Sequence, residues 1–331
     1  AARFIHSSVN ADPSAKIPDD TGEKVTPTPT EEPTQAPVYT DKTAHRYEDY
    51  VTNYLLFGLE QINGGSRSDA MLLVSLNTKD NTIKLTSFMR DTYVTIPGHN
   101  RNKLNAAYGY GGPDLLVDVL ENTYDIEIEG YASVNFTSLE AIVDRLGGID
   151  LELGEAEAKY LRNTNYISKP ENRTVQAGMN HMNGNQVLGY CRVRKVSTLG
   201  GANNDYGRTV RHRRVIKAII EQFKNSSYLD MLSIAKDCLG YLETNVTEDQ
   251  IADALYKVVE NKMFESESMR LPADNYFRDS GRAGINGITY ALVIDDYIDK
   301  NIEAFHQFLF LDPTPTPTGE ATPSPSEGSG P

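Results

Sequence analysis

Two patterns of apolar residues alternate along residues 47–311 of this 331-residue chain: short continuous runs, and apolar residues repeated every three or four positions. Short apolar runs bounded by polar residues are typical of buried strands. Such runs predict strands at residues 54–59, 71–76, 83–88, 126–128 and 131–135. The polar, glycine-rich segment 61–68 is expected to be a loop between the first two strands.

Apolar residues at three- and four-residue steps predict helices elsewhere. Pro113 marks one helix start, and Thr137 with Glu140 and Thr247 with Gln250 match capping boxes. Further helices are expected at residues 207–223, 229–239 and 298–309. Because strands and helices interleave throughout, the pattern predicts an α/β fold: a single layered α/β/α domain with a central mixed sheet.

The two ends of the chain lack this periodicity. Residues 1–46 contain TPTPTEEPTQAP, and residues 312–331 repeat the same Pro, Thr and Ser composition. Such segments are typically extended and solvated, so we expect disordered tails on either side of a domain at residues 47–311. They are interpreted either as spacers that hold the domain away from a surface or as tails without function.

The formal net charge is -14, which argues against a general nucleic-acid binder. The chain contains two cysteines, too few for a disulfide framework. Cys191 is expected to be a buried free thiol. No run of about 18 apolar residues occurs, so the sequence predicts neither a membrane-spanning helix nor a signal peptide. We interpret the chain as an ectodomain or a processed product.

A basic stretch at residues 189–214 departs from this acidic background. It reads GYCRVRKVSTLGGANNDYGRTVRHRR and holds six arginines and Lys195 against one acid, Asp205. Tyr190, Arg192 and Arg194 alternate with apolar residues, which predicts a strand that presents two guanidinium groups on one face. A helix is expected to follow from Gly207.

Asn204 or Asp205 would cap this helix, and Arg208, Arg211 and His212 would share one of its faces. Guanidinium groups from the strand and the first helical turns can converge where the helix dipole also favours an anion. The stretch therefore predicts a phosphate or pyrophosphate site. The alternative is a solvated basic helix face, with the strand arginines in salt bridges.

Six stretches, in order, resemble the LytR-CpsA-Psr (LCP) family of bacterial cell-wall glycopolymer transferases. They cover most of residues 54–220: FGLEQINGGSRSDAMLLVSLN (57–77), LTSFMRDTYVTIPG (85–98), NKLNAAYGYGGPDLLVDVLEN (102–122), VNFTSLEAIVDRLGGIDLEL (134–153), GMNHMNGNQVLGYCRVRKV (178–196) and NDYGRTVRHRRVIKA (204–218). The resemblance implies a phosphotransferase that moves a glycopolymer, such as teichoic acid or capsule, from a polyprenyl-pyrophosphate carrier onto peptidoglycan as a phosphodiester.

The resemblance also implies a location and a set of site residues. The enzyme would act at the outer face of the cytoplasmic membrane, anchored by a transmembrane helix before Ala1. Mg²⁺ would be bound by Asp69 and by Glu60, where the family usually has Asp. The implied pyrophosphate-binding residues are Arg67, Arg90, Arg192, Arg194 and Arg208, with His212 where the family often has Gln.

These residue types suit the implied chemistry. Guanidinium groups contact phosphate oxygens two at a time, and a Mg²⁺ on one or two carboxylates neutralises part of their charge. Asp69 and Arg90 are the implied catalytic residues, with Asp69 available to orient or deprotonate the attacking hydroxyl. Structural alternatives are a turn cap for Asp69, a local salt bridge for Asp91 and an ordinary surface residue for His212.

A carrier lipid would need an apolar channel. The residues proposed to line it are Leu115, Leu116, Val119, Phe136, Leu139, Ile142 and Val143. The alternative is that they are simply core. Two rival functions remain open: a hydrolase that releases polyprenyl-pyrophosphate linkages to water, and a non-catalytic module that binds lipid pyrophosphate or wall polymer.

Overall fold

The computed structural model describes residues 45–62, 65–224 and 227–311. The two predicted tails lie almost wholly outside these residues. Arg46 is an exception, because it is buried and its guanidinium lies 4.2 Å from the centre of the Phe310 ring. The fold therefore reaches into the last residues of the segment that was expected to be an N-terminal tail.

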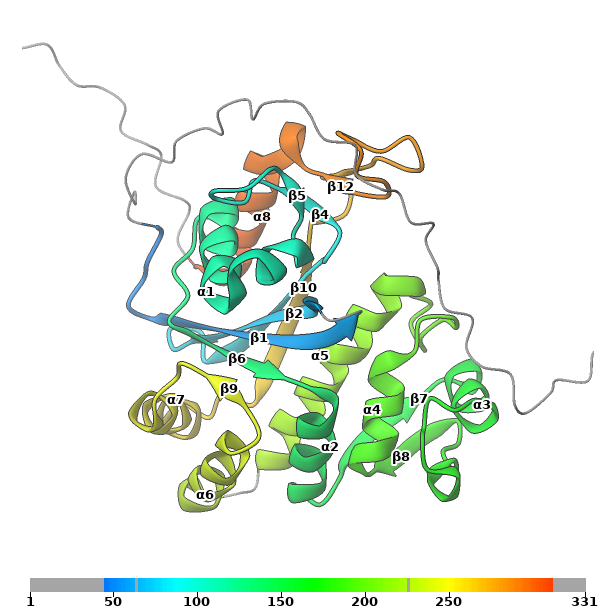
Figure 1. The fold of residues 1–331 in the computed structure, drawn as a ribbon. Helices are drawn as coiled ribbons and strands as arrows, with labels where there is room; N and C mark the ends of the chain where they lie inside the picture. Colours follow the sequence, from blue (N-terminus) through cyan, green and yellow to red (C-terminus); the bar gives the residue numbers. More distant parts are fainter. Residues whose placement is uncertain (1–44, 63–64, 225–226, 312–331) are drawn as a thin grey trace, which may run out of the picture. The chain divides into compact units, whose positions relative to one another are not determined.

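A six-stranded mixed sheet organises the described chain (Figure 1). Its strands, in spatial order, are β10 (Glu265–Leu271), β3 (Thr82–Phe88), β2 (Gly65–Asn77), β1 (Val51–Ile62), β6 (Gly130–Val134) and β9 (Glu243–Thr244). The pairs β1–β2, β2–β3 and β6–β9 are antiparallel, whereas β10–β3 and β1–β6 are parallel. The predicted central mixed sheet is confirmed.

Two small sheets accompany it. One has the order β11 (Arg278–Asp279), β12 (Leu292–Val293), β4 (Thr92–Val94) and β5 (Asn102–Lys103), and the other pairs β7 (Ile149–Leu153) with β8 (Gly178–Met182). The helices are α1 (Asn105–Tyr124), α2 (Phe136–Arg145), α3 (Glu155–Asn163), α4 (Gly184–Arg192), α5 (Asn204–Phe223), α6 (Tyr228–Leu239), α7 (Glu248–Glu260) and α8 (Ile298–Leu309). Two short 3₁₀ turns occupy Pro170–Asn172 and Asp295–Tyr297.

The two faces of the sheet are covered by different helices, as alternation along β2 makes clear. Met71 and Leu73 pack with α1 and α8 on one face, whereas Leu72 and Leu76 pack with α5 and α7 on the other. Successive side chains of a strand point to opposite faces, so an uninterrupted apolar run serves two helical layers. In Figure 1 α1 and α8 lie on one side of the sheet and α5 and α7 on the other. The α/β/α layering is confirmed.

The prediction of a loop at residues 61–68 was wrong. Antiparallel pairing of β1 and β2 continues past a register shift between Gly58 and Leu59, through Glu60 opposite Arg67 to Ile62 opposite Gly65. Backbone hydrogen bonds hold this ladder, and they do not require apolar side chains. The strand predicted at 126–128 is also absent. Ile126 and Ile128 are buried, but they precede β6 in irregular backbone.

The strand predicted at residues 190–194 was wrong as well. Residues 190–192 are the last of α4, which starts at a capping box formed by Asn183 and Gln186. Val187, Tyr190 and Cys191 are its buried apolar side chains, and their three- and four-residue spacing is helical. Short stretches of alternating polarity occur in helices too, so Arg192 closes a helix and Arg194 lies in the loop that follows.

Helix ends show where capping was read correctly. The capping box at Thr247 and Gln250 is confirmed at the start of α7. The box predicted at Thr137 and Glu140 was wrong, because Asn135 caps α2 by accepting from the backbone N–H of Ser138. Helix α5 is capped by Asn203, so the predicted caps, Asn204 and Asp205, instead lie in its first turn.

Two further observations bear on the expectations from composition. Cys191 is a buried free thiol, as predicted, and burial raises its pKa to about 12. Among the helices of the described chain, none combines the length and the apolar character that a membrane crossing requires.

Candidate functional site

The site begins where β2 and β3 lie side by side. Met71 of β2 pairs with Phe88 of β3, so Asp69 and Arg90 lie at the same end of this antiparallel pair. The Arg90 guanidinium donates to Asp69 Oδ2 over 2.7 Å. Asp69 is buried, with 8% of its side chain exposed, and only 18% of the Arg90 side chain is exposed. The register of the sheet thus brings together an acidic and a basic side chain that are 21 residues apart in sequence.

Asp205, in the first turn of α5, joins three arginines from three elements. Its carboxylate lies 2.9 Å from Arg194 Nε, 3.2 Å from an Arg90 terminal nitrogen and 3.2 Å from an Arg208 terminal nitrogen. Arg194 comes from the loop after α4, Arg90 from the end of β3, and Arg208 from the next turn of α5. We call Asp69, Arg90, Arg194, Asp205 and Arg208 the charge cluster.

Arg208 closes the cluster from the helix side. One of its terminal nitrogens donates to the backbone carbonyl of Asp69 over 2.9 Å, and the other lies 3.9 Å from Asp69 Oδ2. Burial lowers the Arg208 pKa, and the neighbouring Arg90 and Arg194 add to this against the attraction of Asp205 and Asp69. For Arg90 burial acts in the same direction, but Asp69, Asp205 and Asp91 outweigh it and raise the pKa. Three guanidinium groups therefore crowd two carboxylates, which favours the approach of a further anion.

Asp91 belongs to a local arrangement instead. Its carboxylate lies 2.9 Å from Lys103 Nζ and 3.6 Å from Arg90 Nε. The salt-bridge interpretation of this residue is confirmed.

Arg192 contacts aromatic rings and no residue of the charge cluster among the described contacts. Its guanidinium lies 5.0 Å from the centre of the Phe136 ring and 5.8 Å from that of Tyr166. Phe136 opens α2 and is 43% exposed. The two arginines that were predicted to stand side by side on a strand are therefore divided, one against aromatic rings and one against Asp205.

His212 faces the end of α4. Its Nε2 lies 3.1 Å from the carbonyl oxygen of Cys191, which can only accept, so Nε2 carries the proton. Burial, with Arg208, Arg213 and Arg211 nearby, lowers the His212 pKa to about 3. The neutral ring then has one N–H, and that N–H holds α4 to α5. Its predicted contact with a phosphate stays a prediction.

Arg211 does not share the exposed face that the helical spacing predicted. It is fully buried and pairs with Glu157, also fully buried, over 2.8 Å. Its terminal nitrogens donate to the carbonyls of Val193 and Val196, each over 2.9 Å. Arg211 therefore anchors the loop that carries Arg194, and its role is structural.

Two predicted site residues, Glu60 and Arg67, are described only by their backbone. Glu60 and Arg67 pair through their backbones in β1 and β2, but their side chains lie outside the described residues. Within the described chain no group of three or more acids, histidines or cysteines could hold a metal ion. The cluster carboxylates still suit Mg²⁺, which usually binds protein through one or two carboxylates and takes further oxygens from phosphate.

Five of the seven residues proposed to line a lipid channel fall into two separate cores. Leu116 and Val119 are fully buried between α1 and the sheet. Val143 is fully buried in a second core formed with β7, α3, α4 and α5, and Leu139 packs at its edge. Their core interpretation is confirmed for these residues, whereas Phe136 is exposed beside Arg192.

Sequence reasoning had named Asp205 only as a helix cap. Its signal was present, since it is the one acid in a stretch of seven cations. An acid that persists among so many cations is expected to be shared by several of them. Contacts of three arginines with this single carboxylate bear that out.

Comparison with known proteins adds independent findings. The LytR_cpsA_psr family matches residues 19–306. The chain is 32% identical over 261 residues to the polyisoprenyl-teichoic acid–peptidoglycan teichoic acid transferase TagU of Bacillus mycoides (strain KBAB4), with 77% of each chain covered. It is 28% identical over 276 residues to the regulatory protein MsrR of Staphylococcus aureus (strain COL), covering 79% of this chain and 80% of that one. The solved structure of TagT bound to LIIa-WTA matches with a TM-score of 0.61 and 26% identity, covering 80% of this chain and 93% of that one.

Proposed function

Because the chain belongs to the LytR-CpsA-Psr family, we propose that it transfers a glycopolymer of the teichoic acid type from a polyprenyl-pyrophosphate carrier to peptidoglycan. The relatives support the reaction class, since TagU is named as a transferase from a polyisoprenyl carrier to peptidoglycan. The charge cluster supports the location of the site in this chain. We further propose that the reaction takes place at the outer face of the cytoplasmic membrane.

The observation that carries the proposal is the convergence of Arg90, Arg194 and Arg208 on Asp205. Three buried or half-buried guanidinium groups are already oriented before any ligand arrives. Such preorganised donors act strongly where water is excluded, because no reorganisation is needed when charge develops in the transition state. A pyrophosphate offers several anionic oxygens to these donors, and each guanidinium can contact two of them.

The proposed step is a displacement at phosphorus. A peptidoglycan hydroxyl attacks the phosphorus that bears the glycopolymer, forming the new P–O bond while the bridging P–O bond of the pyrophosphate breaks. The carrier leaves as polyprenyl monophosphate, and Asp69 accepts the hydroxyl proton. Arg90, Arg194 and Arg208 neutralise charge on the equatorial and leaving oxygens. Arg67, Arg192 and His212 are proposed to contact the same ligand.

Asp69, together with Glu60, would hold Mg²⁺. The ion would neutralise part of the negative charge of the pyrophosphate when bound. Within the charge cluster Asp69 Oδ2 is already engaged by Arg90, so this carboxylate would divide its oxygens between an arginine and the ion.

The test is covalent transfer of a polyprenyl-pyrophosphate-linked glycopolymer to peptidoglycan. The double variant Arg192→Ala/Arg194→Ala is expected to lose transfer while its thermal midpoint stays within a few degrees. Arg192 is exposed, the Arg194 side chain is 40% exposed, and Asp205 keeps Arg90 and Arg208 as partners. Arg282→Ala is the matched control and should transfer normally, because Arg282 is exposed and forms no hydrogen bond or ion pair with the other described residues.

Four results would overturn parts of the proposal. Normal transfer by the double variant would remove these arginines from the site. Release of product without an acceptor would identify a hydrolase, and ligand binding without turnover would identify a binding module. Wild-type transfer that persists in excess EDTA would remove the metal role of Asp69 and Glu60.

A further inference from the structure

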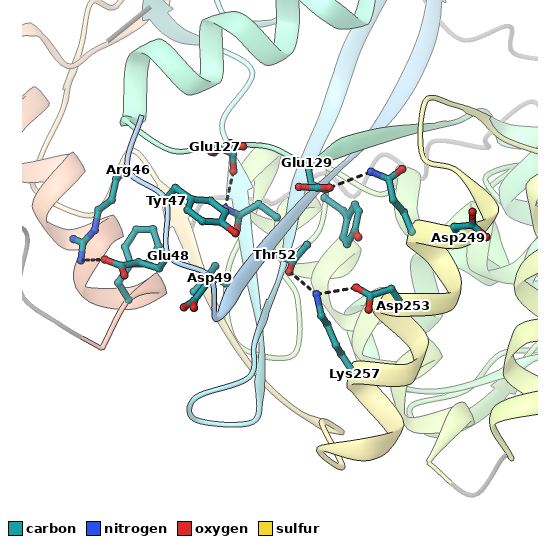
Figure 2. Close-up of a pocket in the computed structure, with 15 residues that line it drawn as sticks. Arg46, Tyr47, Glu48, Asp49, Thr52, Glu127, Glu129, Asp249, Asp253 and Lys257 are labelled. Atoms are coloured by element: carbon teal, nitrogen blue, oxygen red, sulfur yellow. Dashed lines mark hydrogen bonds and ion pairs between the residues drawn. The ribbon is translucent and has the colours of Figure 1, made fainter. Parts of the chain in front are cut away.

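A cavity lies at the opposite end of β1 from the charge cluster. It measures about 400 Å³ and is lined by the first residues of β1, the segment before it, the segment before β6, and α7 (Figure 2). Thr52 lines this cavity, whereas Gly58 pairs with Ala70 beside Asp69. Six residues of strand separate the two positions, which is about 20 Å. The cavity is therefore independent of the proposed transfer site.

The lining of this cavity is strongly acidic. Its acids are Glu48, Asp49, Glu127, Glu129, Asp249 and Asp253, and its cations are Arg46 and Lys257. Both cations are engaged, Arg46 with Glu48 over 3.4 Å and Lys257 with Asp253 over 2.8 Å. Within the described chain the other four acids form no direct ion pair, although Asp249 contributes to the raised pKa of the nearby Lys236 and Glu129 accepts a hydrogen bond from Gln250 over 3.1 Å. Figure 2 shows them on both sides of the start of β1, with Asp249 on α7 and Glu127 and Glu129 on the facing segment.

Asn53 supplies a second, independent indication of a ligand. This cavity-lining side chain is only 5% exposed. Its Nδ2 donates to the carbonyl of Glu127 over 2.8 Å, but its Oδ1 has no hydrogen-bond partner among the described residues. A buried acceptor without a partner is unfavourable unless a donor reaches it. An acceptor among acids suits an N–H donor that carries positive charge.

The chemistry of the lining favours an ammonium over a metal ion. No three acids of the described residues lie close enough together to hold a metal, and the volume is large for a single ion. The cavity already accommodates one alkylammonium, since Lys257 Nζ contacts Asp253 Oδ2 and lies 3.5 Å from Thr52 Oγ1. Tyr47 and Tyr54 also line it, and aromatic faces attract ammonium groups.

We propose that this acidic cavity binds a ligand that carries two ammonium groups on a short aliphatic chain. The acids stand on two sides of the cavity, on α7 and on the segment before β6, so two charged ends can be neutralised at once. The aliphatic part would lie against the tyrosine rings. One N–H would bond to Asn53 Oδ1 once that side chain turns toward the cavity, because the oxygen itself is buried in the free chain.

The test uses 1,5-diaminopentane as the probe, titrated calorimetrically into the full chain. Saturable binding that weakens as salt is added is expected, because the attraction is largely between charges near solvent. Pentane-1,5-diol has the same length and can donate hydrogen bonds but carries no charge, and it is expected not to bind. No binding of the diamine, or equal binding of the diol, would overturn the proposal.

Two variants sharpen the test. The double variant Glu127→Gln/Glu129→Gln keeps the shape of the lining and should weaken diamine binding roughly tenfold, the order expected for two lost exposed ion pairs. The control Glu152→Gln/Glu260→Gln removes the same charge from exposed positions outside the cavity and should bind as the wild type does. An equal loss in both variants would mean that net charge, and not the cavity, attracts the probe.

The variant Lys257→Met is expected to bind the diamine more tightly than the wild type. Removing the resident ammonium frees Asp253, so diamine binding should tighten roughly fivefold. A gain in affinity is not produced by misfolding, and unchanged or weaker binding would contradict the proposal. Transfer activity is measured separately, so the failure of either proposal leaves the other standing.

Discussion

At the scale of single residues, Asp205 orders the charge cluster. We predict that Asp205→Asn lowers the rate of glycopolymer transfer roughly 100-fold, the loss that follows when reacting groups are misplaced by about 1 Å. The amide keeps the shape of the side chain but loses the charge that holds Arg90, Arg194 and Arg208. Asp91→Asn is the neighbouring control, since its acid lies 3.6 Å from Arg90 and pairs mainly with Lys103. Equal losses in the two variants would contradict a special role for Asp205.

His212 permits a prediction of pH dependence. Its folded pKa of about 3 lies below the usual value of about 6.5. Between these values the unfolded chain binds a proton that the folded chain excludes, so this residue reduces stability as pH falls below about 6.5. We expect the stability of the wild type, relative to His212→Gln, to decrease between pH 7 and pH 4.5 in urea unfolding.

The same pKa bears on catalysis. Because the imidazole stays neutral, the rate of transfer should depend on pH in the same way for the wild type and for His212→Gln between pH 6 and pH 7. If the neutral ring turns its one N–H from the Cys191 carbonyl to a phosphate oxygen when ligand binds, His212→Gln should retain activity and His212→Ala should lose roughly 5- to 150-fold. Equal activity of all three proteins would leave His212 with only its contact to Cys191.

At the scale of elements, α5 divides its cations between the charge cluster and the protein core. Arg208 reaches the cluster, whereas Arg211, three residues later, is buried against Glu157. We predict that Arg211→Met lowers the free energy of unfolding by about 3–5 kcal/mol, because it leaves a buried carboxylate without its partner. Arg214→Met, at a position 29% exposed and 3.9 Å from Glu157, should cost no more than about 1 kcal/mol. Urea unfolding of both variants measures the difference.

Sequence patterns located the central elements but not their full extent. The apolar runs at 71–76 and 83–88 became β2 and β3 because both of their faces are buried. The extension of β1 and β2 beyond Gly58 carries polar residues and depends on backbone pairing across a register shift. Alternation at 190–194 was too short to distinguish a strand from the end of a helix, and the capping box at Asn183 was the better signal.

The site was predictable in its residue types and less so in its contacts. Asp69, Arg90, Arg194 and Arg208 do meet, because strand register and a helix start bring them together. Which carboxylate the arginines share depends on how the loop after α4 folds over α5, and no local pattern encodes that. The burial of Arg211 likewise depends on Glu157, a residue 54 positions away.

At the scale of the molecule, charge is divided between two ends of one strand. The formal net charge of the chain is -14, yet its arginines converge near the end of β1. The acids of the acidic cavity surround the start of the same strand. Both arrangements are supported by the same sheet. Under the two proposals made above, an anionic and a cationic ligand would be bound about 20 Å apart without competing for the same side chains.

The C-terminal boundary of the fold gives the last prediction. Helix α8 ends in a buried group formed by Phe305, Leu309 and Phe310, and Asn77 Nδ2 donates to the carbonyl of Leu309 over 3.0 Å. Because these contacts all precede residue 312, deletion of residues 312–331 should leave both the thermal midpoint and transfer in solution unchanged. The deletion of residues 305–331 is the matched control. It removes two aromatic side chains and a leucine from the core, each worth several kcal/mol on the scale of about 2–5 kcal/mol for large-to-small substitutions, and should unfold the chain. If the chain without residues 312–331 keeps its thermal midpoint but no longer transfers glycopolymer, the terminal segment takes part in the reaction.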